Sequence, residues 1–505
     1  MDPNWQNLSD PIFTFAQTRP DAPALNDGGL QLNYRQLATI IGQAAAHLRD
    51  LGIGEDDRIG VALSNSADHI ILDLALLRLG ATLVEMSPDD TPDQLAAQAR
   101  KYGIRTLFTE AQLAPPPGIA QFRVGVSWRR DIARKSGDRR SAKTADQLET
   151  VLLTTGSTGT PSGWITTQRA FLRRAEALHG FWRASGIEPE RETGNYLLMA
   201  PLRHVYFFVS LVAQFCAGGP VAVMPEFLRR RDFLREVASW DNVMCYATAN
   251  MCRYFLESAA EAGCLLPNIR ILQSGGQPLF AEEKRALIAR VTPQFYDGYG
   301  TAGMGMISIL TPTDLITRPG AVGRPARGVE LEIVDDSGQT VAPGGYGRIR
   351  CRSASMSLRR CVEDGVTESA EHISDGWYYP GDIGMVDPDG FIHLRGRASD
   401  VARREGGDVF TPEVEAVLRS YPGVADAAVI VRRNRSGQDV IVAFVVKRSE
   451  FTHEALAQHC RSQLAPGRTP DNVYYIDTLP RLGADKIDRV RLGELAAQEA
   501  MKAAR

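Results

Sequence analysis

The chain has little of what marks a secreted, metal-bound or nucleic-acid-binding protein. Its seven cysteines are odd in number and form no C-x-x-C pair, which argues against a disulfide framework and favours a reducing cytoplasm. The eight histidines show no metal-ligand spacing with them, so we expect no metal site built from side chains. A net charge of -3 and a pI near 6.3 provide no general attraction to nucleic acid or to an anionic membrane.

Signals for export or membrane insertion are missing as well. The first residues, MDPNWQNLSDPIF, have neither the basic start nor the apolar core of a signal peptide. The most apolar stretch, residues 70–86, is interrupted by Asp73, Arg78 and Glu85. Such charges are costly inside a bilayer, so the stretch is predicted to be a buried helix and strand and not a membrane span.

The length and the hydrophobic pattern predict two domains. A chain of 505 residues is long enough for more than one core. Between residues 32 and 279, segments with helical spacing alternate with short apolar runs, which predicts an α/β fold with parallel sheets covered on both faces. After Pro319, short strands separated by Gly and Asp turns predict a small β-barrel-like subdomain, over about residues 319–397. We therefore expect a large N-terminal domain, 1–397, and a small α+β C-terminal domain, 398–505.

The most informative segment is TTGSTGTPSGW, residues 154–164. Its glycines allow tight turns that bring backbone N–H groups near an anion, and its hydroxyls add donors. It follows Leu152 and Leu153, which indicate the end of a buried strand. The segment is therefore predicted to hold a polyphosphate, although it is neither a Walker loop nor G-x-G-x-x-G. Taken alone, it is equally consistent with a solvated loop.

Further segments decide between these two interpretations, because they follow one another in a characteristic order. They are Pro201-Leu202-Arg203-His204, Ser274-Gly275-Gly276-Gln277-Pro278-Leu279, Asp297-Gly298-Tyr299-Gly300, Gly376-Trp377-Tyr378-Tyr379-Pro380-Gly381-Asp382, Gly396-Arg397, Arg404-Glu405-Gly406-Gly407-Asp408 with Pro412-Glu413-Val414-Glu415, and Pro480-Arg481-Leu482-Gly483-Ala484-Asp485-Lys486-Ile487-Asp488-Arg489. In this order they resemble the motifs of the adenylate-forming superfamily, which includes acyl-CoA synthetases, luciferases and peptide-synthetase adenylation domains. The resemblance covers nearly the whole chain.

The resemblance implies a two-step reaction and a mobile C-terminal domain. A carboxylic acid substrate attacks the α-phosphorus of ATP, pyrophosphate leaves, and a nucleophile then takes the acyl group and releases AMP. ATP and AMP contacts are implied for Thr154, Thr155, Gly156, Ser157, Thr158, Gly159, Thr160, Gly275, Gly276, Gln277, Asp297, Gly298, Tyr299, Gly300, Thr301, Asp382 and Arg397. Of these, Tyr299 would stack on adenine, Asp297 would accept from the adenine amino group, and Asp382 would accept from the ribose hydroxyls.

The remaining assignments also follow from the resemblance. Catalytic roles are implied for Lys486, His204 and Arg397, with Lys486 bridging the substrate carboxylate and the α-phosphate. Gly406 and Gly407 would line a tunnel for the thiol. The acyl pocket would be formed by His204, Tyr206, Phe207, Phe208, Ala247, Asn250, Gly275 and Met304. Because residues 205–208 offer no aspartate for an amino group, we expect an uncharged aromatic or aliphatic acid and not a free amino acid.

The chain departs from the superfamily pattern on the phosphate side. Ser162 stands where the signature loop has a lysine. Ala302 and Gly303 stand where Y-G-x-T-E has its threonine and its magnesium-binding glutamate, and Pro380 and Asp485 replace a threonine and a glycine. Mg²⁺ would therefore be held mainly through the ATP phosphates. We expect adenylation that is slower, or more dependent on magnesium, than in related enzymes.

The acyl acceptor is left open by the sequence. CoA is the first expectation, and the phosphopantetheine of a carrier protein or an amine is the alternative. An alternative of another class is a pseudoenzyme that binds nucleotide without catalysis. The retained Asp382, Arg397 and Lys486 favour an active enzyme.

Overall fold

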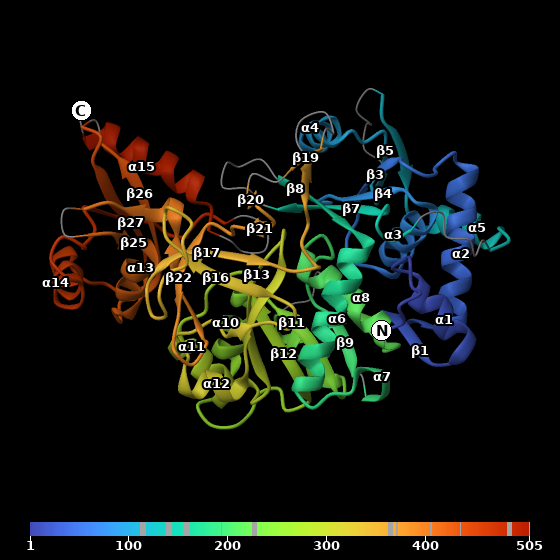
Figure 1. The fold of residues 1–505 in the computed structure, drawn as a ribbon, viewed down its shortest axis with the longest axis horizontal. Coiled ribbons are helices and arrows are strands. Elements are labelled where there is room, and N and C mark those ends of the chain that lie inside the picture. The colour runs from blue at the N-terminus through green and yellow to red at the C-terminus, as the bar shows by residue number, and fades with distance from the viewer. Residues whose placement is uncertain are drawn as a thin grey trace.

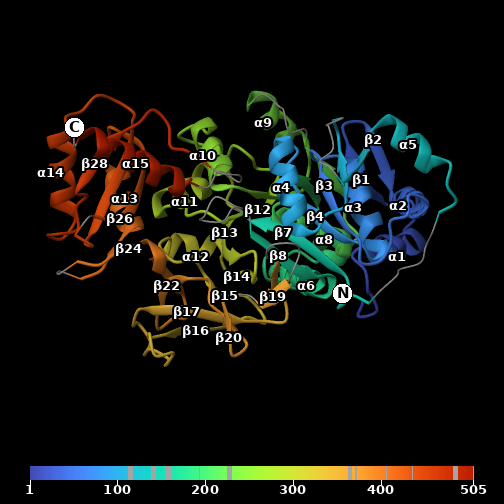
Figure 2. The ribbon, with the colours of Figure 1, turned by 90° about the horizontal axis from the view of Figure 1, so that it is seen from above.

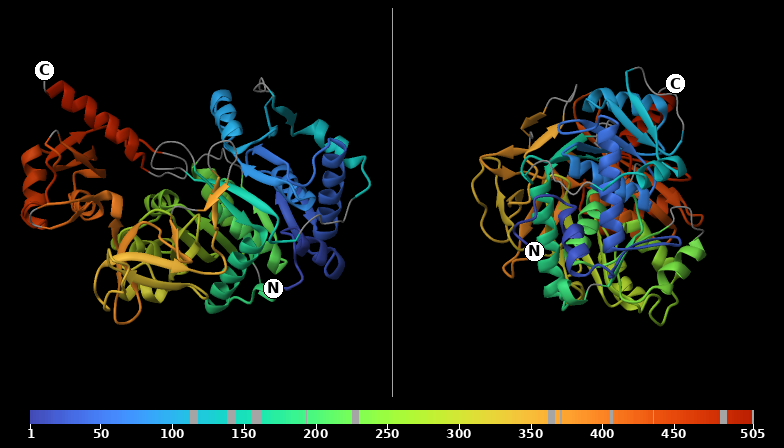
Figure 3. Two further views of the ribbon diagram at one scale, coloured as in Figure 1. Left: turned by 45° about the horizontal axis from the view of Figure 1, so that its top comes forward. Right: turned by 90° about the vertical axis from the view of Figure 1, so that its right-hand side faces the viewer.

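The computed structural model describes residues 1–111, 118–137, 144–154, 162–192, 194–224, 230–361, 367–369, 372–404, 407–434, 436–481 and 487–503. Three parts follow one another along the chain, and they occupy different regions of the molecule (Figure 1). The blue strands near the N-terminus and the red C-terminal elements lie at opposite ends (Figure 3). The helices are α1 (Asp10–Thr18), α2 (Tyr34–Asp50), α3 (Ala67–Leu79), α4 (Pro92–Tyr102), α5 (Val126–Ala133), α6 (Gln168–Ala184), α7 (Pro189–Glu192), α8 (Val205–Ala217), α9 (Arg230–Ser239), α10 (Ala249–Ser258), α11 (Ala281–Ala286), α12 (Pro312–Thr317), α13 (Thr411–Ser420), α14 (His453–Gln463) and α15 (Arg489–Ala503).

Two large sheets form the N-terminal part, and both have the predicted parallel centre. The nine-stranded sheet has antiparallel pairs at both edges, whereas the eight-stranded sheet has them at one edge only. In spatial order the nine-stranded sheet is β15 (Arg324–Pro325), β14 (Gly305–Leu310), β13 (Phe295–Thr301), β12 (Ile269–Gly275), β11 (Val243–Ala247), β9 (Asn195–Leu198), β10 (Val221–Val223), β1 (Pro23–Asp27) and β2 (Leu30–Asn33). The eight-stranded sheet is β19 (Thr367–Ser369), β18 (Arg359–Cys361), β8 (Ser162–Thr167), β7 (Glu149–Thr154), β4 (Thr82–Glu85), β3 (Arg58–Ala62), β5 (Thr106–Thr109) and β6 (Ala120–Arg123).

Helices α3, α6 and α8 form a layer between these sheets. Helix α3 contacts β4 of one sheet and β1 of the other, and α6 likewise contacts β8 and β14. Every residue of α3 is buried, from its N-cap at Ser66 to the left-handed Gly80 that ends it. A helix covered on all sides has no polar face, which explains the long apolar run in the sequence.

The charged residues of that run are buried in pairs. Arg78 bonds Ser9 and Asp10. The Nε2 atom of His69 lies 3.3 Å from Glu85 and 3.4 Å from Asp73, and all three side chains are at most 2% exposed. Burial, and then the neighbouring Glu85, raise the pKa of Asp73. These three are the one group among the described residues with metal-ligand spacing, but a proton held on Asp73 accounts for the second buried carboxylate.

Replacing Asp73 by asparagine should make the protein relatively more stable as the pH rises. The raised pKa means that the folded protein keeps a proton that the unfolded chain loses above about pH 4. Above that pH, the free energy of unfolding of the wild type falls by about 1.4 kcal/mol for each pH unit. The fall ends when the pH reaches the raised pKa of Asp73 in the folded protein. Asparagine has no such proton to lose. Urea unfolding at pH 4 to 8 measures the difference, with the exposed Asp93→Asn as control, and a constant difference across this range would contradict the assignment.

The β-rich subdomain is built on an antiparallel sheet (Figure 2). Its strands are β16 (Glu330–Val334), β17 (Gly347–Arg352), β20 (Ile373–Ser374), β21 (Trp377–Tyr378), β22 (Asp382–Val386) and β23 (Ile392–Arg397). One edge of β17 pairs with β16, and the other is shared by β21 and β22. The interval 319–397 is not uniform, however, because β15, β18 and β19 belong to the two large sheets.

The C-terminal part is a small α+β unit, and the domain division at 397/398 stays a prediction. Its strands are β24 (Val401–Ala402), β25 (Val409–Phe410), β26 (Val424–Arg433), β27 (Asp439–Lys447) and β28 (Asn472–Tyr475). It contacts the rest of the chain through the ion pair of Arg395 with Glu413, and through Arg419, whose guanidinium lies over the Phe280 ring. In the described part of the chain, no helix combines the length and apolarity needed to cross a membrane.

Candidate active site

A carboxylate, a guanidinium and a phenol meet where the subdomain joins the nine-stranded sheet. The register of β22 and β23 places Asp382 directly opposite Arg397. Nε of Arg397 lies 3.0 Å from Oδ1 of Asp382, and its Nη1 donates to the Pro380 carbonyl over 2.7 Å. The Tyr299 hydroxyl, from the end of β13, donates to Oδ2 of Asp382 over 2.5 Å. Three residues from separate motifs of the sequence are therefore brought together.

The electrostatics of this cluster follow from its burial. Desolvation raises the pKa of Asp382, and the Arg397 guanidinium acts in the opposite direction. Desolvation and the Asp382 charge both raise the pKa of Tyr299, which keeps its proton on the hydrogen bond. The bond fixes the direction of the Tyr299 ring, while Arg397 remains half exposed. The cluster thus presents an oriented aromatic ring beside a buried acceptor and an accessible cation.

Glycines are required where β12 and β13 end beside this cluster. A Cβ atom at Gly275 would lie 2.4 Å from the Gly298 carbonyl oxygen and 2.9 Å from the Tyr246 hydroxyl. A Cβ atom at Gly300 would lie 2.0 Å from the Tyr206 hydroxyl. The glycines therefore allow close packing of the strands against tyrosines. Contact of Gly275, Gly276, Gln277 and Thr301 with a nucleotide stays a prediction.

Asp297 is already engaged by a residue that the sequence did not single out. Nζ of Lys284, in α11, lies 2.6 Å from Oδ2 of Asp297 and also donates to the Ala321 carbonyl. Both side chains of the pair are less than a tenth exposed. Burial raises the pKa of Asp297, and Lys284 opposes that shift. One carboxylate oxygen of Asp297 is therefore used inside the protein.

The phosphate loop joins two paired strands. Thr154 ends β7 and pairs with Ser162 at the start of the antiparallel β8, so the position of the missing lysine lies in a strand. Thr155, Gly156, Ser157, Thr158, Gly159 and Thr160 lie outside the described residues, as do Gly406 and Lys486. Gly407 is described, and it is exposed with a positive φ of 100°. The roles assigned to these residues stay predictions.

Gly303, which stands in place of the magnesium-binding glutamate, is enclosed by aromatic rings. A Cβ atom there would lie 2.9 Å from Cη2 of Trp164 and 3.0 Å from Cε2 of Tyr378. The carbonyls of Ala302 and Gly303 accept hydrogen bonds from Arg174 of α6. Neither residue offers a side-chain oxygen to a metal ion. Magnesium therefore has no carboxylate ligand at this point of the site.

The predicted acyl-pocket residues do not share a single cavity. Phe207, Phe208, Ala247 and Met304 are core residues, at most 2% exposed. Tyr206 stacks on Tyr246 with ring centroids 5.0 Å apart. His204 is the N-cap residue of α8, its ring is 6.5 Å from that of Phe207, and Asn250 accepts a hydrogen bond from Arg253. Of the predicted set, only Tyr206 lines the cavity that opens between α6, α8 and β14.

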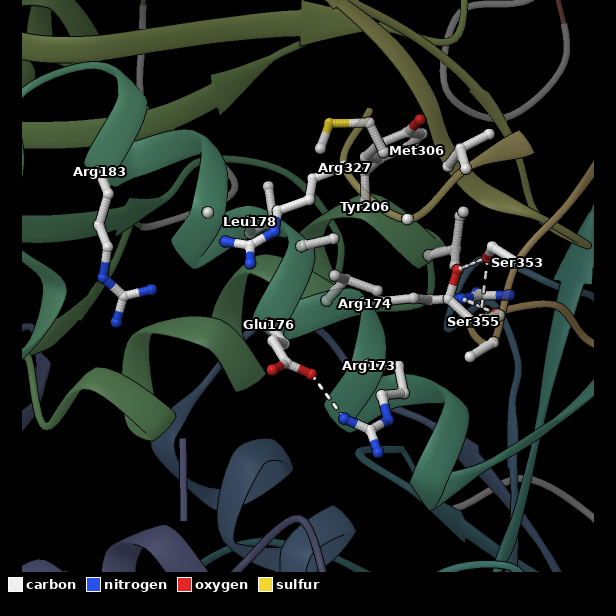
Figure 4. Close-up of a pocket in the computed structure, with 18 residues that line it drawn as sticks. Arg173, Arg174, Glu176, Leu178, Arg183, Tyr206, Met306, Arg327, Ser353 and Ser355 are labelled. Carbon is white, nitrogen blue, oxygen red and sulfur yellow. Dashed lines mark hydrogen bonds and ion pairs between the residues drawn. The ribbon is translucent and has the colours of Figure 1, made fainter. Parts of the chain in front are cut away.

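That cavity, of about 360 Å³, opens between α6, α8 and β14 (Figure 4). Its walls include Tyr206 and Val209 of α8, Leu178 of α6, and Met306 of β14. Charged side chains also line it, and they are Arg173, Arg174, Glu176, Arg183 and Arg327. Sequence analysis missed these residues, because arginines on a helix are ordinarily solvated and nothing in the sequence shows that Arg174 faces inward.

The chain matches a known family model and several known relatives. A family model described as AMP-binding enzyme matches residues 12–359, and its C-terminal domain model matches residues 413–486. The chain is 27% identical to 4-coumarate--CoA ligase 2 of Oryza sativa subsp. japonica, over 98% of this chain and 93% of that protein. It is also 27% identical to the 2-succinylbenzoate--CoA ligase of Geobacillus kaustophilus, over 98% of each chain.

Solved structures with this fold superpose on nearly the whole chain. O-succinylbenzoate coenzyme A synthetase from Bacillus subtilis, in complex with ATP and magnesium ion, gives a TM-score of 0.84 at 22% identity, covering 97% of this chain and 99% of that one. An anthranilate CoA ligase in complex with anthranoyl-AMP gives a TM-score of 0.85 at 22% identity, covering 98% and 99%. The expected fold class is confirmed by these superpositions.

Proposed function

Because the chain belongs to the AMP-binding enzyme family, we propose that it is an AMP-forming acid–thiol ligase that uses ATP to activate a carboxylic acid. In the first step a carboxylate oxygen bonds to the α-phosphorus of ATP, and the bond from that phosphorus to the β-bridging oxygen breaks. Pyrophosphate carries away the electron pair, and an acyl-adenylate remains. In the second step the sulfur of CoA bonds to the acyl carbon, its proton is lost, and AMP leaves.

The observation that supports this proposal most directly is the cluster of Tyr299, Asp382 and Arg397. An aromatic ring fixed by a hydrogen bond is suited to stack on a base, and a carboxylate beside it is suited to accept from ribose hydroxyls. Arg397 can turn its exposed donors to a phosphate. We assign Lys486 to the bridge between the carboxylate and the α-phosphate, and the 154–160 loop to the β- and γ-phosphates.

These groups would act by positioning the reactants and by stabilising the charge that develops at the α-phosphate. The attacking carboxylate is already ionised at neutral pH, so the first step requires no proton transfer. Fixed donors beside the α-phosphate lower the barrier by opposing the charge that develops there.

Magnesium would arrive with ATP and be held by phosphates and water. The relative from Bacillus subtilis was solved with both ATP and magnesium ion. In this chain the side chains at positions 302 and 303 supply no oxygen, and Arg174 already uses the backbone carbonyls there. The described residues at positions 302 and 303 therefore do not fit a Mg²⁺ ion held by protein side chains.

We expect a magnesium titration to show that the protein contributes little to Mg²⁺ binding. Because position 303 has no carboxylate, half-saturation by Mg²⁺ at fixed ATP should need a several-fold higher concentration than in a superfamily member that has the glutamate of Y-G-x-T-E. The initial rate of ATP–pyrophosphate exchange measures this in both proteins under one buffer. Equal half-saturation would show that another group compensates for Gly303.

ATP–pyrophosphate exchange over a panel of aromatic and aliphatic acids tests the function itself. Exchange that depends on one acid class is expected, with amino acids inactive. Absence of exchange for every acid, with ATP still bound, would favour the nucleotide-binding pseudoenzyme. Mass spectrometry of products formed with CoA, a phosphopantetheinyl carrier protein or an amine then identifies the acceptor. We place the reaction in the cytoplasm, on the basis of cysteine usage.

A further inference from the structure

We propose that the cavity between α6 and α8 binds the unactivated end of the acid substrate and that this end carries a second carboxylate. The inference rests on the proposed function, since it concerns which acid the enzyme activates. It makes the substrate a dicarboxylic acid, aromatic or aliphatic, with one carboxylate at the nucleotide and the other at Arg174 and Tyr206.

Arg174 is a buried cation that has no anionic partner among the residues the structure describes. Its side chain is 3% exposed, yet its hydrogen bonds run only to backbone carbonyls and to the Ser357 hydroxyl. Across the described part of the chain, no carboxylate pairs with it, and its Nη1 atom has no hydrogen-bond partner. Desolvation lowers the pKa of Arg174 to about 10, so it remains charged at neutral pH. A buried, unpaired guanidinium is costly, and a bound anion would remove that cost.

The Tyr206 hydroxyl is the second unsatisfied group on the same cavity. It is buried and has no hydrogen-bond partner among the described residues. Arg174 and Tyr206 lie close enough to influence each other electrostatically. One carboxylate can accept from both groups, because it has two oxygens and no donor of its own. The two orphaned donors therefore match one ligand group.

The cavity also lies next to the proposed site of activation. The Tyr206 hydroxyl packs against Gly300, the residue that follows Tyr299. Arg174 binds the carbonyls at Ala302 and Gly303, on the turn that joins β13 to β14. Both groups thus touch the hairpin that carries Tyr299. An acid held at the nucleotide would reach the cavity along this hairpin.

The rim of the cavity has an excess of positive charge. Arg173 is neutralised by Glu176 at 2.7 Å. Arg327 projects over the cavity (Figure 4) and has no ion pair in the described ranges. This lining favours an anionic substrate end and disfavours an amine. The proposal thus differs from the sequence-based expectation of an uncharged acyl part, because the sequence did not reveal the inward position of Arg174.

Paired substrates test the inference directly. Each member of a series of aliphatic and aromatic dicarboxylic acids is compared with its mono-methyl ester, which retains one carboxylate to activate. In ATP–pyrophosphate exchange, kcat/KM for the preferred diacid should exceed that for its ester by about tenfold or more, the usual value of hydrogen bonds to a charged group. Equal use of both would overturn the inference and leave the proposed function intact. No exchange with any acid would instead remove the proposed function.

Two variants locate the effect. Arg174→Met should bring the ratio of diacid to ester close to one, and Tyr206→Phe should lower the ratio by about three- to tenfold. Tyr206→Phe keeps the ring, so it remains informative if Arg174→Met does not fold. Tyr196→Phe is the matched control, because it removes a buried hydroxyl outside this cavity. Unchanged ratios in both cavity variants, or an effect confined to the KM of CoA in the second step, would contradict the assignment.

Discussion

Replacing Asp382 by alanine should reduce kcat/KM for ATP in pyrophosphate exchange by about 100-fold or more, equivalent to roughly 3 kcal/mol. The carboxylate orients both Tyr299 and Arg397, through bonds of 2.5 and 3.0 Å. Removing it frees the ring and the guanidinium together and removes the proposed acceptor for ribose. The loss should fall on binding and on the transition state, because each of these groups is proposed to contact the nucleotide.

The control for this variant separates the acceptor from the ring. Tyr299→Phe retains the aromatic face and removes one hydrogen bond, so we expect only about a three- to tenfold loss. Using 2′-deoxy-ATP sharpens the test. The wild type should discriminate against it, whereas Asp382→Ala should not, since the missing hydroxyl no longer has a partner. Thermal unfolding of each variant confirms that it is folded. A loss below threefold, or discrimination that survives the substitution, would contradict the role of Asp382.

The fold could be predicted from the sequence largely because its signals are local. Helical spacing, short apolar runs and turn residues indicated the parallel sheets and a β-rich segment after them. The return of residues 359–361 to the eight-stranded sheet had no such signal. It is a pairing with β8, nearly 200 residues earlier, and local pattern carries no information about such a partner.

The site was predictable to a different degree. Motif order placed Tyr299, Asp382 and Arg397 in one site, and the register of β22 and β23 explains why two of them meet. Lys284 and Arg174 could not be found in this way. Their roles depend on which face of a helix is buried, and both side chains lie on helices where a cation is ordinarily solvated. The phenylalanines of α8, predicted to line the acyl pocket, are buried in the structure, and their lining role stays a prediction.

Restoring the superfamily's glutamate at position 303 should destabilise the protein and should not improve its use of magnesium. The Cβ atom alone would lie within 3.0 Å of Trp164 and Tyr378. Real Cβ contacts are longer, so the two rings must move, and overpacking of this kind costs about 1–3 kcal/mol. The carboxylate would also be placed between aromatic rings, which adds a desolvation cost of similar size. We expect the free energy of unfolding to fall by about 2–5 kcal/mol.

Matched variants distinguish steric exclusion from a loss of charge. Gly303→Ala should show most of the packing cost, while Ala302→Thr, at a partly exposed neighbouring position, should be tolerated. The double variant Trp164→Leu with Gly303→Glu should lose less free energy of unfolding than the sum of the two single variants, because the smaller leucine makes room for the glutamate. Urea unfolding and the magnesium titration measure both properties. If Gly303→Glu folds as stably as the wild type and lowers the magnesium requirement, steric exclusion by Trp164 and Tyr378 is wrong. If it unfolds easily, the glutamate alone cannot restore the metal ligand, since Trp164 and Tyr378 occupy the space beside residue 303.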